Sequence, residues 1–260
     1  MKGEKMEINK KVVLRKVFFT AAVVVLALLL ALSLSSCITI RLNNKDIKGS
    51  GEVASKDFEV SDFDRLDFSG IGNIIITQGE TESLNVEAES NVIERLEISS
   101  SGKMLKIGYK NNFFNIIPTK PINFYLNVKD LREISISGVG SIKCDKLTTD
   151  DLSIDSSGAG SVDMNLITTV FEVALSGAGK VNLTGQTQSQ SIDISGAGSY
   201  SAKEFTSKDC KISISGIGRA IVNASDTLDV KMSGLGSVEY VGKPAISQDI
   251  SGRGSVKSIN

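Results

Sequence analysis

The sequence predicts an all-β chain folded as a parallel β-helix, on three observations: a recurring tetrapeptide, its near-constant spacing, and alternating apolar residues around it. The tetrapeptide Ser-Gly-x-Gly begins at Ser69, Ser137, Ser157, Ser176, Ser195, Ser215, Ser233 and Ser251. From Ser137 onward the serines lie 20, 19, 19, 20, 18 and 18 residues apart. A fixed period of this size is typical of repeat architectures, in which each repeat is one structural unit.

Aliphatic residues form columns when the repeats are aligned on their serines, at three and one residues before the serine and at five and seven after it. The column three before contains Ile134, Ile154, Val173, Ile192, Ile212, Val230 and Gln248, and the column five after contains Ile142, Val162, Val181, Tyr200, Ala220, Val238 and Val256. Alternate residues of a strand point to opposite faces. We therefore expect residues 131–260 to form rungs of 18–20 residues, each with an apolar inward face.

The glycines are predicted to form the corner of each rung, where a bend needs either an unusual φ or a close backbone approach. The residue between them is usually aliphatic, so we expect it to add another apolar column. In the last copy Arg253 takes that place, which fits a terminal rung in contact with water. Seven rungs at about 4.8 Å each predict a rod on the order of 34 Å long.

The stretch before the regular repeat, residues 52–130, is predicted to be β-rich, because short apolar runs alternate with polar residues. Strands are expected at 63–68, 73–77, 84–88, 104–107 and 122–128. One helical turn is expected over 91–96, with Asn91 as its cap and Glu94 three residues later.

The first 36 residues have the order of a secretory signal peptide: a basic start, an apolar run from Val17 to Leu32, and small residues before Cys37. The apolar run is short for a transmembrane anchor of about 20 residues, which is the alternative. Leu34-Ser35-Ser36-Cys37 resembles the bacterial lipobox, and that resemblance implies cleavage before Cys37 and lipid attachment to it. Residues 37–51 are mostly polar and are predicted to be a flexible tether.

Composition excludes several classes of function. The chain has no His, which removes Ser-His-Asp and Cys-His catalysis and His metal ligands. Residues 1–36 carry six basic and two acidic side chains, leaving 23 basic and 28 acidic from residue 37 on, so we expect no nucleic-acid binding. The Gly-x-Gly pairs lack the third glycine and the Lys-Ser/Thr of nucleotide loops, and we expect no cofactor.

Two cysteines and two acidic groups are the remaining candidates for chemistry. Cys144 and Cys210 fall in different columns several rungs apart, which predicts two buried free thiols. The acidic groups are Asp145, Asp150, Asp151 and Asp155, and Asp62, Asp64 and Asp67. Paired carboxylates can cleave glycosides or hold Ca²⁺, but Lys143 and Lys146 interleave with the first group. We interpret both groups as solvated outward faces and predict neither catalytic nor metal-binding residues.

The stretch Phe68-Ser69-Gly70-Ile71-Gly72-Asn73-Ile74-Ile75-Ile76-Thr77-Gln78-Gly79, followed by the serial Ser-Gly-x-Gly rungs, resembles the family named "putative auto-transporter adhesin, head GIN domain". The similarity covers about residues 58–256. It implies a right-handed, single-stranded β-helix of the kind found in envelope lipoproteins of Gram-negative bacteria. It carries over no catalytic residues, and fold alone does not fix function.

These observations together predict a lipid-anchored protein of the Gram-negative outer membrane, on its periplasmic face or the cell surface. Its function is predicted to be non-catalytic binding or adhesion, with glycan or protein ligands on the outward faces of the rungs. Two alternatives stay open: a polysaccharide lyase or glycosidase using surface carboxylates, and a periplasmic structural or stress-linked envelope protein.

Overall fold

The computed structural model describes residues 46–110 and 116–259. Residues Ile47–Asn260 form one compact unit with its own hydrophobic core. The predicted signal peptide, residues 1–36, and Cys37 lie outside the described residues.

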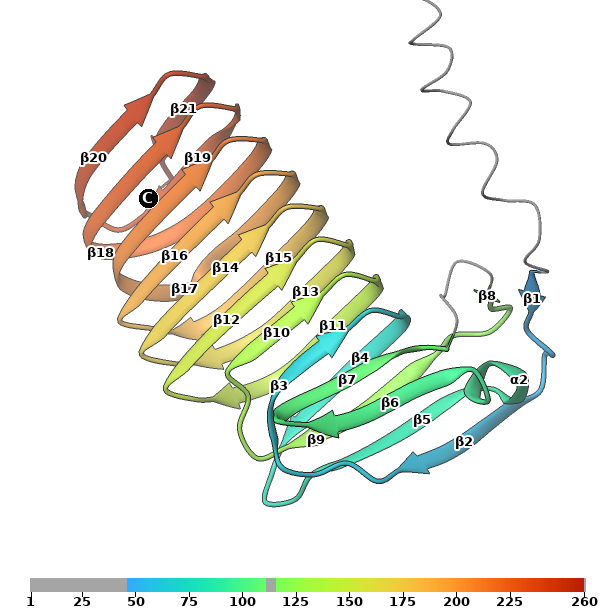
Figure 1. Cartoon of the computed structure of the whole chain (residues 1–260). Helices are drawn as coiled ribbons and strands as arrows, with labels where there is room; N and C mark the ends of the chain where they lie inside the picture. The colour runs from blue at the N-terminus through green and yellow to red at the C-terminus, as the bar shows by residue number, and fades with distance from the viewer. Residues whose placement is uncertain (1–45, 111–115, 260) are drawn as a thin grey trace, which may run out of the picture. The chain divides into compact units, whose positions relative to one another are not determined.

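The compact unit is a parallel β-helix whose rungs each contain two strands (Figure 1). One strand of every rung belongs to face A, which comprises β3 (Phe63–Phe68), β10 (Glu133–Ile136), β12 (Asp151–Ser156), β14 (Val170–Leu175), β16 (Ser189–Ile194), the later parts of β17 (Ala197–Ile214) and β18 (Ile217–Met232), and β20 (Ala245–Ile250). The other belongs to face B, which comprises β4 (Ile71–Gln78), β11 (Val139–Thr148), β13 (Ala159–Ile167), β15 (Ala178–Gln186), the early parts of β17 and β18, β19 (Leu235–Val241) and β21 (Arg253–Ser258). The predicted fold class is confirmed.

The isolated first copy of the tetrapeptide is part of the same stack, although Ser137 lies 68 positions after Ser69. Ile71 pairs with Val139 and Gly72 with Gly140 on face B, while Leu66 pairs with Ile134 on face A. The residues between β4 and β10 are therefore an insertion between the first rung and the second.

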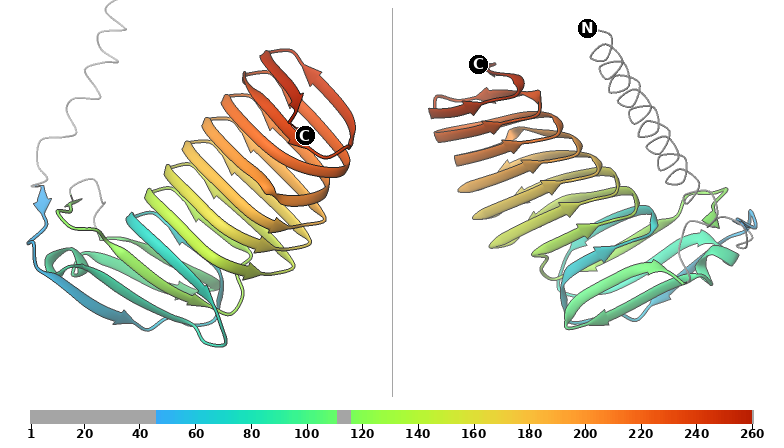
Figure 2. Two further views of the ribbon diagram at one scale, coloured as in Figure 1. Left: turned by 180° about the vertical axis from the view of Figure 1, so that it is seen from behind. Right: turned by 45° about the horizontal axis from the view of Figure 1, so that its top comes forward.

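This insertion, together with β1 (Ile47–Lys48) and β2 (Val53–Phe58), forms a cap on the first rung (Figure 2). Its elements are β5 (Ser83–Glu89), α2 (Ser90–Ile93), β6 (Leu96–Ser101), β7 (Lys103–Tyr109), β8 (Ile116–Ile117) and β9 (Asn123–Val128). β7 continues face A and β9 continues face B in parallel. Beyond them, β6, β5 and β2 add antiparallel pairs, so the regular stack ends here.

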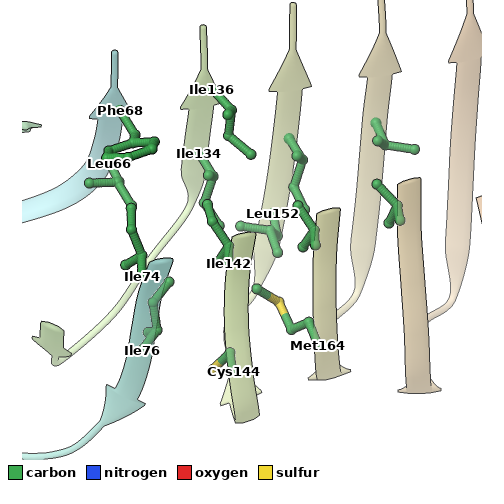
Figure 3. Close-up of a cluster of buried hydrophobic side chains, with 14 of the residues drawn as sticks. Leu66, Phe68, Ile74, Ile76, Ile134, Ile136, Ile142, Cys144, Leu152 and Met164 are labelled. Atoms are coloured by element: carbon green, nitrogen blue, oxygen red, sulfur yellow. The ribbon is translucent and has the colours of Figure 1, made fainter. Parts of the chain in front are cut away.

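The predicted columns occupy the interior (Figure 3). Leu66, Ile134 and Ile154 stack in register on face A, and Ile76, Cys144 and Met164 stack on face B; all are buried. Fully burying an aliphatic side chain of this size contributes about 1.5–3 kcal/mol. Repetition of the same contacts from rung to rung therefore builds a narrow core from few aromatic residues.

The helical turn differs from the prediction in its start and its cap. α2 begins at Ser90, its N-cap is Glu89, and no side chain caps it. The Asn91 amide instead accepts from the Ser50 N–H at 2.9 Å and donates to the Lys48 carbonyl at 2.8 Å. The expected capping role of Asn91 was wrong because that side chain binds the segment before β2.

The first glycine of each tetrapeptide, from Gly138 to Gly252, is required by close packing. Among the tetrapeptide glycines only Gly72 has a φ in the left-handed range, at +147°. A Cβ on Gly158 would overlap the Gly138 carbonyl oxygen, and one on Gly177 would overlap the Gly158 carbonyl oxygen. Each corner therefore rests directly on the backbone of the corner one rung earlier.

From the second copy on, the residue between the two glycines is exposed, contrary to the expectation of another inward column; Ile71, in the first copy, is partly buried against the core. Val139, Ile217 and Leu235 are 48%, 64% and 48% exposed. Where the chain enters face B, the side chain of the residue between the glycines points outward. The second glycine and every second residue after it therefore face inward.

We predict that Gly177→Ala destabilises the protein and that Gly179→Ala does not. The Cβ at 177 meets the Gly158 carbonyl, whereas the nearest atom to a Cβ at 179 is the Ser156 Oγ at 3.4 Å. Forced overlap in a packed interior typically costs about 1–3 kcal/mol, while a compatible Gly→Ala change stabilises by about 0.4–1 kcal/mol. Urea unfolding of the two variants measures the difference, and equal midpoints would contradict a packing role for the corner.

Candidate binding surface

The outward side chains of face A are mostly charged or small and polar. Two outward columns, four and two residues before each serine, contain Glu133, Ser153, Glu172, Ser191, Lys211, Asp229 and Ser247, and Ser135, Asp155, Ala174, Asp193, Ser213, Lys231 and Asp249. Their register is fixed by the same backbone pairing that aligns the core. Face A therefore presents a regular polar surface across the rungs.

A hollow of about 220 Å³ lies on face A where β14, β16, β17 and β18 pass side by side. It forms because the small residues Ser189 and Ser191 pair with Val170 and Glu172 on one side. On the other side the same two serines pair with Asp209 and Lys211. We call the residues lining it the face A hollow; its outward members are Val170, Glu172, Ser189, Ser191, Asp209, Lys211, Thr227 and Asp229.

The face A hollow combines hydrogen-bond donors and acceptors around a partly apolar wall. The Thr227 hydroxyl donates to Asp209 Oδ1 at 2.6 Å, which fixes that carboxylate at the rim. Glu172 and Asp229 supply further acceptors, Lys211 supplies a donor, and the serine hydroxyls can do both. Val170 is 39% exposed and adds an apolar contact surface.

The floor behind the hollow is held by a buried polar network. Tyr200 donates to the Gln190 side-chain carbonyl at 2.7 Å, and the Gln190 amide donates to the Ser207 hydroxyl at 2.8 Å. Ser207 in turn donates to the Asn223 carbonyl at 3.1 Å. Every buried side-chain nitrogen and oxygen in the described part of the chain has a partner. A satisfied network of this kind fixes side-chain positions, so the strands under the hollow are held rigidly.

A second, more open hollow of about 480 Å³ lies on face A beside the cap. Two positively charged side chains of this hollow form salt bridges with carboxylates. The Arg132 guanidinium lies 3.0 Å from the Asp130 carboxylate and 3.6 Å from that of Asp151, and the Lys103 ammonium contacts Asp62. The hydrogen bond to Asp130 raises the pKa of the Arg132 guanidinium above its usual range. These charges satisfy one another, leaving fewer free groups for a ligand than in the face A hollow.

The predicted acidic residues lie on the surface, and only Asp64 and Asp151, one from each group, are brought together, in the lining of the second hollow. Asp145, Asp150 and Asp155 are exposed, Asp151 pairs with Arg132, and Asp62 and Asp64 contact Lys103 and Arg65. Asp67 points outward from β3, half-buried. No set of three or more acidic or cysteine side chains within residues 46–110 and 116–259 is arranged to hold a metal ion.

The prediction for the cysteines is confirmed: Cys144 and Cys210 are free and buried. Burial raises the pKa of the Cys144 thiol to about 11 and the pKa of the Cys210 thiol further still. The thiolate is the reactive form, so both side chains act as small apolar core residues at neutral pH.

Cys37, the predicted lipid-attachment residue, lies outside the described residues. No helix in the described ranges is both long enough and apolar enough to cross a membrane.

The fold is shared with solved structures. A protein described as a putative adhesin from Bacteroides fragilis is 27% identical, with a TM-score of 0.77 over 82% of this chain and 100% of that one. One described as a putative lipid binding protein from Parabacteroides distasonis is 24% identical, with a TM-score of 0.64 over 83% of this chain and 100% of that one. A third, described as a putative adhesin from Parabacteroides merdae, is 22% identical, with a TM-score of 0.61 over 84% and 100%.

A search of curated proteins finds no match to this chain. The model of one protein family matches residues 62–244, from the last residue before β3 to the loop before β20. That range includes seven of the eight corner tetrapeptides and the whole inserted cap from β5 to β9. The chain therefore belongs to the family described as "Putative auto-transporter adhesin, head GIN domain".

Proposed function

We propose that this protein is a lipid-anchored, non-catalytic binding module of the Gram-negative cell envelope that holds glycan or protein surfaces on face A. The observation that carries the proposal is the face A hollow, the place where donors, acceptors and an apolar wall meet on a rigid sheet. Membership of an adhesin-named family and likeness to the Bacteroides fragilis protein support a role in adhesion.

The chemistry of the hollow suits a polyhydroxylated ligand. Each sugar hydroxyl both donates and accepts, and it would find carboxylates at Glu172 and Asp229, an ammonium at Lys211, and hydroxyls at Ser189 and Ser191. Repeat proteins generally use such extended, regular surfaces for binding. The rung spacing would let a long ligand continue along neighbouring outward columns.

We predict that filling the hollow weakens ligand binding. Residues 38–260, which contain the whole compact unit, are passed over immobilised bacterial polysaccharides and mucin glycoproteins, and binding is followed by interferometry. Ser191→Trp is expected to weaken binding at least tenfold, because the indole occupies the space between Glu172 and Lys211. Ser161→Trp is the matched control, since Ser161 is also half-buried and outward-facing, but on face B.

Saturable binding of a glycan by the wild type and by Ser161→Trp, without cleavage of that glycan, supports the proposed binding module. Equal binding by the two tryptophan variants would place the ligand elsewhere. Release of new reducing or unsaturated sugar ends would instead favour the carbohydrate-active enzyme.

Lipid attachment at Cys37 is the second part of the proposal, supported by its place directly after the apolar run of the signal peptide. We predict that Cys37→Ser moves the protein from the membrane to the soluble fraction in a Gram-negative host. Mass spectrometry of the wild type should find an acylated peptide beginning at residue 37. An uncleaved wild-type chain would favour the transmembrane alternative.

A further inference from the structure

The segment through which the chain enters the fold, Ile47–Glu52, is bound to the cap around one buried carboxylate. Glu89, the last residue of β5, has 0% of its surface exposed. Its carboxylate accepts from the Gly51 N–H at 2.6 Å, from the Thr119 N–H at 2.8 Å and from the Thr119 hydroxyl at 2.6 Å. The Lys120 N–H adds a longer bond of 3.3 Å.

These donors come from segments far apart in the sequence, so Glu89 joins the entry segment to the loop after β8. The Thr119 hydroxyl, with the backbone N–H groups, lowers the pKa of Glu89 to about 2 against the opposing effect of burial. Gly49 packs so closely that a Cβ there would overlap the Glu89 carboxylate. The carboxylate is thus ionised and enclosed by the entry segment.

Backbone bonds surround this centre. The Gly49 N–H donates to the Ile117 carbonyl at 3.0 Å, and the Ser90 N–H donates to the Glu52 carbonyl at 2.9 Å. Asn91 bonds to residues 48 and 50, as described above, and β1 pairs with β8 in parallel. We call this arrangement of Glu89, Asn91, Thr119 and residues 48–52 the Glu89 latch.

The chain immediately after the latch is weakly attached. All residues from 47 to 59 are described; Ile47 and Phe58 are partly buried against the hydrophobic core, and Val60 is the first residue with a fully buried side chain. β2 pairs only with β5 and is exposed along nearly its whole length. β3, in contrast, lies between β7 and β10 with hydrogen bonds on both sides, so the first rung is the next firm point of attachment.

We propose that the Glu89 latch is the point through which tension on the N-terminal tether enters the solenoid, and that its opening releases β1 and β2 while the rungs stay folded. A module held by a lipid at one end and a ligand on face A would be pulled between these points, so the biological role of the latch rests on the proposed function. Local opening of a weakly buried segment ahead of the core is ordinary behaviour for a folded protein.

Force spectroscopy on residues 38–260, with one handle at each end, tests the latch. The wild type should show a short first extension, separate from unfolding of the rungs. It should be shorter than about 45 Å, the contour length of residues 47–59 at roughly 3.3–3.6 Å per residue, because β2 is already extended in the fold. Glu89→Gln should lower the force of this first step and leave the later steps unchanged. The glutamine NH₂ group is a donor, so it cannot accept the hydrogen bonds that one carboxylate oxygen of Glu89 receives from the backbone N–H groups around it.

Glu87→Gln is the matched control, because Glu87 lies two residues earlier on the same strand and receives only a 3.4 Å bond from the Tyr125 hydroxyl. Amide exchange provides a second readout: peptides covering 47–58 should exchange at least tenfold faster in Glu89→Gln, with exchange in 170–232 unchanged. A wild type without the short step, or equal behaviour of the two variants, would overturn the proposal. Because the handles replace anchor and ligand, the result does not depend on whether Cys37 is acylated or face A binds.

Discussion

The structure depends on one steric constraint: at every corner the backbone of a rung lies directly on the backbone of the rung before it. The first glycine of the tetrapeptide faces the carbonyl oxygen of its predecessor, with no room for a side chain, from Gly138 through Gly252. This contact fixes the register between rungs. With the register fixed, inward residues stack on inward residues and outward residues form columns. These columns run without a shift on face A from β3 to β20, whereas register shifts interrupt them on face B.

The same constraint determines where function can lie. The corners are closely packed backbone, and the interior is filled by aliphatic and aromatic side chains, two thiols and a satisfied polar network. Only outward residues can be substituted without disturbing the packing between rungs. A change in the size of an outward side chain alters the shape of the surface alone. The face A hollow arises in this way, from two serines on β16 between rungs that carry larger side chains.

Most of the fold could be predicted from the sequence because rung periodicity and strand alternation are both local signals. The columns through Ile134 and Ile142 and the burial of both cysteines follow from alignment on the serines alone. The membership of Ser69 in the same stack could not be predicted, because the inserted cap interrupts the period. The sequence also does not predict that the Ile217 side chain points outward, because an aliphatic residue between two glycines can point either toward the core or toward solvent.

The two candidate functional features were beyond sequence reasoning for a different reason. The hollow is a difference in size between residues on neighbouring rungs, and Ser191 by itself is an ordinary polar residue. Glu89 ends an alternating strand and is indistinguishable in sequence from a solvated carboxylate; its donors come from residues 51, 119 and 120. The closely spaced glycines at 49 and 51 were the one available signal of a tight approach.

The proposed adhesion role requires that face A meet ligands outside the cell, and labelling intact cells with a membrane-impermeant amine reagent tests this requirement most directly. Lys211 and Lys231 are exposed on face A. A surface adhesion module should be labelled at both lysines on intact cells as fully as after the outer membrane is opened. Labelling only after opening would contradict the claim and would favour a structural role inside the periplasm.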